Sequence, residues 1–337
     1  MAAIILIGSL VAAYWLRYGL LPLRPQNGRL PGPDPQLEPV LNSVRTGEWE
    51  PAALLVGSAG SDWNLRAHYV QHLAYTAVYD DGAWLAKWHA ARPEDPDALL
   101  VSACARVEYA WKLRGAAYAS ATSAEQAQGF HRELAGARQD LAHIAALNPD
   151  DPTPFAKEIW VALGLGYSKE QMRSLWTEVT KRAPDHYQAH SAALQYKCRK
   201  WRGSAQEAEQ FAAEAARRAP RGSLLTVLPL VSWYEHHVLD AEGRVPTESF
   251  RTPALIALVD AVLDDVAAAE GHPNLPSARH ALAYFLLRQG RYRAAVEQFR
   301  HVDGYAEAFP WRYRPWKKLS YRAHRTRAMW GALLTRR

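Results

Sequence analysis

Residues 168–184 read SKEQMRSLWTEVTKRAP, and this stretch contains both ends of one predicted helix. Ser168 followed by Gln171 is a capping-box pattern, in which a serine oxygen and an amide satisfy free backbone N–H groups at a helix start. Pro184 ends the helix, because proline cannot continue the hydrogen-bond ladder. The apolar residues between them recur on one helix face: Met172, Trp176 and Val179.

The same start and stop signals recur along the chain. Ser123 with Gln126 and Ser204 with Glu207 repeat the capping pattern. Prolines end predicted helices about every 35 residues, at Pro149, Pro184 and Pro220. The helices before the first and last of these prolines keep the same apolar phase, with Ala137, Leu141 and Ile144, and with Ala208, Ala212 and Ala215. The chain is therefore predicted to be built from repeated helix pairs.

This pattern resembles the tetratricopeptide repeat, a helix pair of about 34 residues with small residues where the helices cross. The clearest copy is LAYFLLRQGRYRAAVEQF at 282–299, which has the family spacing at Ala283, Gly290, Tyr292, Ala295 and Phe299. A weaker echo consists of Gly47, Trp49 and Ala52. The resemblance covers roughly residues 98–302, with looser helical character from residue 39. It implies an α-solenoid, whose stacked pairs share a core and leave a curved groove.

A second resemblance rests on AWKLRG at 110–115 and KWRGS at 200–204. These stretches look like an uncharacterised bacterial family of tetratricopeptide-like domains, over about 82–218. That resemblance implies the fold and carries no activity. Further helices are predicted at 222–239, with a kink at Pro229, at 253–269 and at 276–289. No alternating run predicts a strand, so the fold is expected to be all-α.

Of the 337 residues, 49% are apolar, which is enough for a large core. The charged fraction of 22% is ordinary for a soluble protein and too low for a disordered one. Cys104 and Cys198 both fall in predicted helices, where each is expected to be a small buried hydrophobe. A reducing compartment is the simpler assumption for a chain with two such cysteines.

The N-terminal segment is predicted to be an apolar helix over 1–23, and thus a membrane anchor. Residues 2–16 would span about 22 Å as a helix, and 2–23 about 33 Å if Arg17 reaches an interface. Because arginines follow the apolar run, the positive-inside rule predicts a single-pass anchor in the cytoplasmic membrane with a cytoplasmic domain. The alternatives are a signal peptide, or a helix buried in the chain's own domain, which would make the protein cytoplasmic. Residues 24–38 are interpreted as a linker and 39–309 as the repeat domain.

Two histidine pairs have the i, i+4 spacing that zinc can use, His68 with His72 and His186 with His190. Neither pair has the glutamate of a metalloprotease motif or a nearby cysteine cluster. Structural histidines are the plainer interpretation, and no cofactor or metal is predicted. No nucleophile motif, phosphate-binding glycine loop or desolvated carboxylate signal is apparent, so no catalytic residue is assigned.

The 13 tryptophans mostly occupy helical positions, where core packing is the plain interpretation. A few are candidates for groove anchors, as aromatic residues are at interface hot spots. The predicted partner-binding residues combine such tryptophans with neighbouring cations: Arg106, Trp111, Arg114, Lys200, Trp201 and Arg202.

The tail, residues 310–337, carries nine Lys/Arg and no Asp/Glu, while the net charge of the whole chain is +6. Basic residues interleaved with aromatics suit an anionic membrane surface or single-stranded nucleic acid. A solvated capping helix is the third alternative. The residues assigned to a membrane surface are Arg312, Arg314, Trp316, Lys317, Lys318, Arg322, Arg325 and Arg327.

The sequence therefore predicts a non-catalytic scaffold that binds an unknown protein or peptide and is tethered to the cytoplasmic face of a membrane. Two alternatives stay open. One is an enzyme with a helical-repeat body and a histidine-pair metal site, and the other is a nucleic-acid binder acting through the basic tail.

Overall fold

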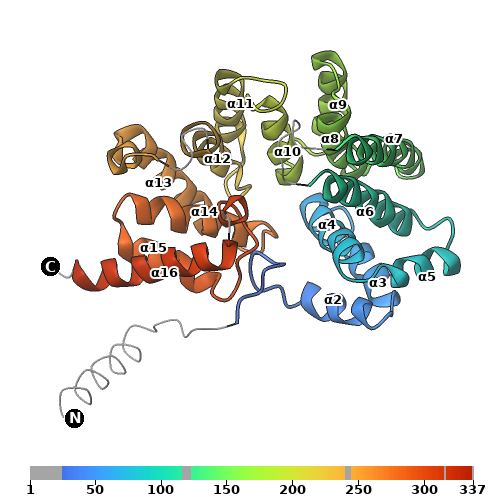
Figure 1. The fold of residues 1–337 in the computed structure, drawn as a ribbon, viewed down its shortest axis with the longest axis horizontal. Helices are drawn as coiled ribbons and strands as arrows, with labels where there is room; N and C mark the ends of the chain where they lie inside the picture. The colour runs from blue at the N-terminus through green and yellow to red at the C-terminus, as the bar shows by residue number, and fades with distance from the viewer. Residues whose placement is uncertain (1–24, 116–122, 240–243, 315, 336–337) are drawn as a thin grey trace, which may run out of the picture. The chain divides into compact units, whose positions relative to one another are not determined.

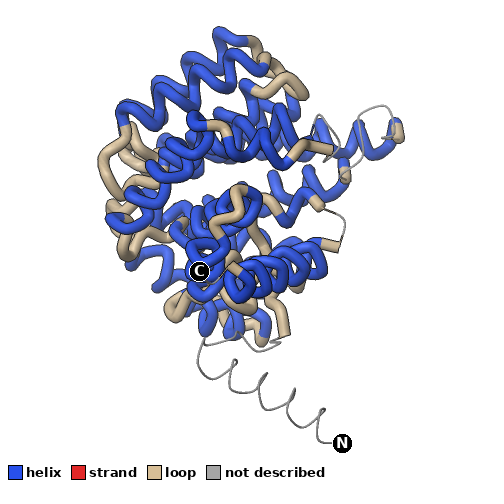
Figure 2. The backbone as a smooth tube through the Cα atoms, turned by 90° about the vertical axis from the view of Figure 1, so that its left-hand side faces the viewer, coloured by secondary structure: helices blue, strands red, loops and turns tan. Residues whose placement is uncertain are grey.

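The computed structural model describes residues 25–115, 123–239, 244–314 and 316–335. Across these residues the chain forms fifteen α-helices and no β-strand, which confirms the predicted all-α class (Figure 2). One isolated β-bridge joins Asn27 and Tyr305.

The described residues fall into two compact units. The larger unit comprises residues 34–244 and 268–274, and the smaller unit comprises residues 25–33, 245–267 and 275–335. The larger unit contains the following helices: α2 (Leu37–Arg45), α3 (Glu50–Ser58), α4 (Trp63–Tyr79), α5 (Ala83–Ala91), α6 (Pro96–Arg114), α7 (Ala124–Leu147), α8 (Thr153–Leu165), α9 (Lys169–Arg182), α10 (Tyr187–Lys197), α11 (Ala205–Arg218), η2 (Leu225–Val227), α12 (Leu228–Trp233) and the π-helical η3 (Tyr234–Leu239). The smaller unit contains η4 (Thr247–Arg251), most of α13 (Pro253–Ala268), α14 (Leu275–Arg288), α15 (Tyr292–His301), η5 (Trp311–Tyr313) and α16 (Lys317–Leu334). Figure 1 shows how these helices follow one another within each unit.

Helix starts lie where the capping residues predict them. Ser123 begins α7 and Ser168 begins α9, each with both hydrogen bonds of a capping box. At α11, Ser204 Oγ accepts from the backbone N–H of Glu207 at 3.1 Å. The Glu207 carboxylate, however, accepts from Lys169 Nζ on α9 at 2.5 Å. An ion pair between α9 and α11 therefore takes the place of the predicted bond from the Ser204 backbone N–H to the Glu207 side chain.

The three recurring prolines lie in loops, as predicted. Pro149 follows α7, Pro184 follows α9 and Pro220 follows α11. Pro229, where a kink was predicted, lies in the first turn of α12, directly after the 3-10 turn η2. Proline is tolerated in a first helical turn, because the amide that it lacks needs no partner within that helix.

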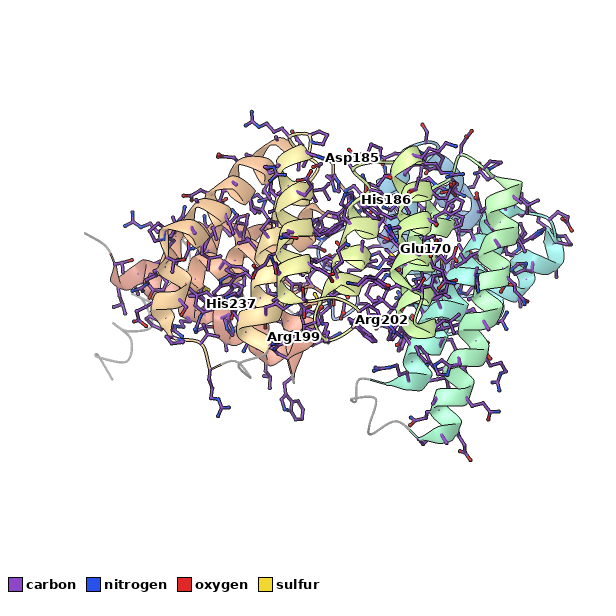
Figure 3. The ribbon with its side chains drawn as sticks, turned by 90° about the horizontal axis from the view of Figure 1, so that it is seen from above. Glu170, Asp185, His186, Arg199, Arg202 and His237 are labelled. Atoms are coloured by element: carbon purple, nitrogen blue, oxygen red, sulfur yellow. The ribbon has the colours of Figure 1, made fainter. Side chains whose placement is uncertain are left out.

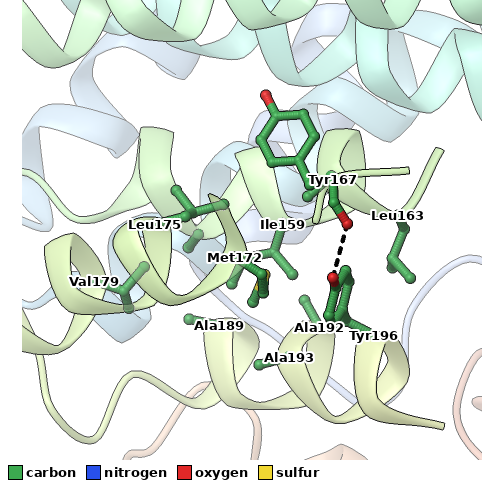
Figure 4. Close-up of a cluster of buried hydrophobic side chains, with 12 residues drawn as sticks. Ile159, Leu163, Tyr167, Met172, Leu175, Val179, Ala189, Ala192, Ala193 and Tyr196 are labelled. Carbon is green, nitrogen blue, oxygen red and sulfur yellow. Dashed lines mark hydrogen bonds between the residues drawn. The ribbon is translucent and has the colours of Figure 1, made fainter. Parts of the chain in front are cut away.

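The core of the larger unit is built by neighbouring helices that interlock through small residues. Figure 4 shows one cluster, in which α8, α9 and α10 meet over Ile159, Met172 and Val179. Ala189, Ala192 and Ala193 are fully buried on the facing side of α10, where small side chains allow the backbones to approach closely. The hydroxyl of Tyr196 donates to the carbonyl of Tyr167 at 2.8 Å, which joins the end of α10 to the end of α8.

In the larger unit, alternate helices along the chain also pack against one another: α4 contacts α6, α6 contacts α8 and α8 contacts α10. Charged residues bind these helices together from within. Arg66 on α4 donates to Asp97 at 2.5 Å and to Asp151 at 2.7 Å. Lys157 on α8 donates to Glu108 on α6 at 2.7 Å. Burial alone would lower the pKa of Lys157, but the Glu108 carboxylate raises it above its ordinary value.

The core of the smaller unit surrounds Trp311, which is fully buried. Its indole N–H donates to Nδ1 of His280 at 2.9 Å, and His280 Nε2 donates to the carbonyl of Pro31 at 2.7 Å. The described part of residues 24–38 thus contributes to this core, with Leu30 only 2% exposed. The repeat-like residues Ala283, Ala295 and Phe299 are also fully buried in this unit.

The predicted N-terminal apolar helix, residues 1–23, lies outside the described residues. Among the residues that the structure does describe, no helix combines the length and hydropathy needed to cross a bilayer.

Candidate functional site

Three of the predicted partner-binding residues meet in space although they lie far apart in the sequence. Trp111 and Arg114 occupy the last turn of α6, and Trp201 lies in the turn between α10 and α11. The Trp111 and Trp201 rings meet edge to face with centroids 5.5 Å apart. The Arg114 guanidinium lies over both rings, 5.6 Å from Trp111 and 5.4 Å from Trp201. We call these three residues the tryptophan–arginine cluster.

Two further aromatic residues pack on Trp111 of the cluster. Trp160 of α8 and Phe130 of α7 pack edge to face on Trp111, with centroids 6.0 and 5.0 Å away. The sequence does not mark Phe130 as a site residue, and it predicts Trp160 to be a core residue. The capping box at Ser123 sets the start of α7, and counting helical turns from it could have placed Phe130 on the buried face.

The turn that carries Trp201 is shaped by close backbone packing. Gly203 leaves no room for a side chain, because a Cβ there would overlap the carbonyl of Lys197. The adjacent Arg202 side chain crosses to α8 and lies against Gly166, whose φ of +71° ends that helix in the left-handed region. Figure 3 shows Arg202 at the opposite end of α10 from His186.

The cluster is partly accessible from solvent, because Trp111, Arg114 and Trp201 are each only partly buried. The indole N–H of Trp111 is shielded from solvent and has no hydrogen-bond partner among the described residues. A ligand would therefore meet the rings and the guanidinium, and not this N–H.

Two of the predicted cations, Arg114 and Arg202, form no ion pair with a carboxylate within the part of the chain that the structure describes. Arg114 donates to the carbonyl of Gly115, at 3.3 Å. Its guanidinium beside two partly exposed tryptophan rings forms a surface suited to a carboxylate with a neighbouring apolar side chain.

Arg106 and Lys200, also predicted to bind a partner, form ion pairs elsewhere. Arg106 donates to Glu133 and to Asp140 on α7, both at 3.0 Å. Lys200 donates at 2.6 Å to Glu235, whose carboxylate is buried and also accepts from Gln195 at 2.9 Å. These contacts hold helices together, so the structure does not bring Arg106 or Lys200 into the cluster.

The first histidine pair has structural neighbours. His68 Nε2 lies 2.9 Å from Asp34 Oδ2, and its ring meets His72 edge to face at 4.6 Å. Burial and the neighbouring His68 lower the pKa of His72 to about 3.

The second pair is more deeply buried. His186 caps α10, with Nδ1 accepting from the backbone N–H of Ala189 at 3.2 Å, and burial lowers its pKa to about 4. His190 packs against Trp176 and Phe211. No group of three or more metal-ligating side chains forms among the described residues.

The basic tail presents its cations in two directions. Three of the eight predicted membrane-surface residues turn toward the smaller unit: Lys317 pairs with Glu307, Arg325 lies 2.9 Å from Asp303, and Arg314 donates to the hydroxyl of Tyr284 at 3.3 Å. The others are exposed or half-buried on the outer side: Arg312, Trp316, Lys318, Arg322 and Arg327.

Comparisons with protein-family models, with curated proteins and with solved structures find no match to this chain. Any function assigned to it therefore rests on its own residues.

Proposed function

We propose that this protein is a non-catalytic scaffold of tetratricopeptide-like repeats, an α-solenoid that binds a protein or peptide at the tryptophan–arginine cluster. The observation that carries the proposal is the meeting of Trp111, Arg114 and Trp201, with a guanidinium that forms no ion pair among the described residues. A partner segment with a carboxylate beside an apolar side chain would pair with this guanidinium and cover the tryptophan rings.

The repeat interpretation is supported by the way helices alternate in the larger unit. Helices α8 and α10 each follow a proline-terminated helix, and they pack against one another. The capped helices α9 and α11 are joined by the Lys169–Glu207 pair at 2.5 Å. Equivalent positions of successive pairs are thus in contact, as nearest-neighbour stacking in a solenoid requires.

The membrane tether remains part of the proposal through residues 1–23. Their apolar run and the arginines that follow it support a single-pass anchor with the domain in the cytoplasm. Fractionation tests this assignment: the full chain should sediment with membranes at high salt, whereas a chain lacking residues 1–23 should not. Full-length protein that stays in the supernatant without detergent contradicts the tether and leaves the binding surface untouched.

Photo-crosslinking in cells tests the binding surface directly. Benzoylphenylalanine replaces Trp201 in one variant and Trp176 in another, because Trp176 is also a half-buried tryptophan of the larger unit but packs on His190 and Phe211. We expect discrete crosslinked partners from position 201 and none from position 176. Equal crosslinking at both positions would indicate non-specific contact and contradict the proposal.

Once a partner is isolated, charge variants measure what the cluster contributes. Arg114→Gln and Arg202→Gln are each expected to weaken binding by about tenfold or more, because each removes a cation that forms no ion pair among the described residues. Arg221→Gln is the matched control, an exposed arginine of the same unit. Unchanged affinity in both the Arg114 and the Arg202 variant would contradict this assignment.

A further inference from the structure

Large apolar side chains are exposed on α16 to an unusual extent. Four of the eight large hydrophobic residues exposed within the described chain lie at 316–334, so exposure is concentrated on one short segment. They are Trp316 at 79%, Leu319 at 59%, Trp330 at 58% and Leu334 at 79%.

The helical geometry gathers these side chains on one face. At about 100° per residue, Leu319, Trp330 and Leu334 lie within roughly 60° of one another. The opposite face holds Tyr321, Arg325 and Ala328, all buried in the smaller unit. Tyr321 donates to the carbonyl of Val302 at 3.1 Å, which fixes the rotation of the helix. The apolar stripe is therefore held outward by the packing of the other side.

Cations flank the stripe on both sides. Lys318 and Arg322 lie along one edge and Arg327 along the other, at roughly 60 to 100° from Leu319 around the helix. Lys318 and Arg327 are exposed. No Asp or Glu occurs in residues 308–337, so no acidic side chain within the helix neutralises this charge.

The residue before the helix adds a further apolar group. Trp316 has φ +57° and ψ +50°, a left-handed conformation that a bulky side chain adopts only under constraint. It is nevertheless 79% exposed, so its ring gains no burial within the described chain to offset that conformation.

We propose that the outer face of α16 lies on an anionic lipid bilayer, with Leu319, Trp330 and Leu334 in the headgroup region and Lys318 and Arg327 on lipid phosphates. An apolar stripe bordered by cations is the arrangement of interfacial helices, which bury their apolar face at the boundary of headgroups and acyl chains. The leucines favour lipid over nucleic acid, because an aliphatic side chain gains little from stacking on bases. This inference does not depend on the tryptophan–arginine cluster.

Depth-dependent quenching tests the proposal in the full chain. Ala323→Cys, in the middle of the outer face, is labelled with nitrobenzoxadiazole, and Ala257→Cys on α13 is the matched control, an exposed alanine of the same unit. The native Cys104 and Cys198 are buried, so they compete little for the label. With nitroxide lipids in vesicles of equal parts phosphatidylcholine and phosphatidylglycerol, we expect quenching at 323 and none at 257. Vesicles of phosphatidylcholine alone should quench position 323 far less.

Charge and apolar variants then separate the two contributions. Lys318→Gln with Arg327→Gln should weaken partitioning to anionic vesicles by roughly 25-fold, at about fivefold per cation near such a surface. Arg293→Gln, an exposed arginine on α15, should leave it unchanged. Leu319→Ala with Leu334→Ala should abolish quenching at 323 without unfolding the protein, because both leucines are exposed.

Three results would overturn the proposal. The first is an unquenched label at 323 in anionic vesicles. The second is a label that responds to single-stranded RNA and not to vesicles. The third is a label that responds to protein concentration without lipid, since a second copy would then cover the face. Crosslinking at Trp201 is read out separately, so the failure of one proposal leaves the other standing.

Discussion

At the scale of single residues, the larger unit depends on buried charges that are matched to one another. Asp151 is fully buried, accepting from Arg66 at 2.7 Å and from the backbone N–H of Thr153 at 2.7 Å. Asp151→Asn keeps the shape and the backbone acceptor but leaves Arg66 with less compensating charge. We expect it to lower the free energy of unfolding by about 3 kcal/mol, as measured by urea denaturation followed by circular dichroism.

The comparison for that variant is Glu178→Gln, which breaks the Glu178–Arg182 pair on α9. The Glu178 side chain is 43% exposed, and water screens such a pair. Its loss should cost less than about 1 kcal/mol. Equal losses of unfolding free energy in the two variants would contradict the view that burial makes the Arg66–Asp151 pair important for stability.

At the scale of the helix, the same substitution of serine by alanine should have opposite effects on stability at two positions of α9. Ser168→Ala removes the oxygen that accepts from the backbone N–H of Gln171 at 3.2 Å, and should destabilise the larger unit by about 1 kcal/mol. Ser174→Ala, in the exposed middle of the same helix, should be neutral or slightly stabilising, because alanine has the higher helix propensity and the lost bond to Glu170 is 3.3 Å long. Urea titrations of both variants measure the two changes in the free energy of unfolding. Destabilisation by Ser174→Ala and not by Ser168→Ala would contradict the capping role of Ser168.

At the scale of the whole molecule, buried neutral histidines make folding sensitive to acid. His186 in the larger unit and His280 in the smaller unit both have a pKa that burial lowers to about 4. Below the ordinary value near 6.5, the unfolded chain binds protons that the folded chain excludes, so stability is complete above that pH and falls from about pH 6.5 toward pH 4. The loss should approach roughly 3 kcal/mol for each histidine.

His280 is the better test of this linkage, because both of its ring nitrogens are already assigned. A proton on Nδ1 would face the Trp311 N–H that now donates to it. Urea unfolding at pH 7.5 and pH 5.0 should give a smaller difference for His280→Gln than for the natural chain. His131→Gln, at an exposed position on α7, should keep the full difference. An unchanged pH dependence in His280→Gln would show that the acid sensitivity arises elsewhere.

The sequence by itself determined the all-α class and the ends of the capped helices α7, α9 and α11, because caps and prolines act within one turn of the residues that carry them. Ser123 and Ser168 begin helices, and Pro149, Pro184 and Pro220 follow them, without reference to any distant residue. The exception, Pro229, shows the limit of that local rule: the same residue ends, kinks or starts a helix according to where the neighbouring chain packs.

Only the tertiary structure decided which side chains meet. Trp111 and Trp201 were both candidates from the sequence, but their contact depends on how α6, α8 and α10 stack. The sequence likewise could not separate Arg114, which has no carboxylate partner among the residues that the structure describes, from Arg106, which pairs with Glu133 and Asp140. On α16, the helical period sorts residues into faces, but only packing against the smaller unit decides which face is turned outward. Contacts of this kind depend on distances between remote segments, and those distances are set by the whole core and not by any local pattern.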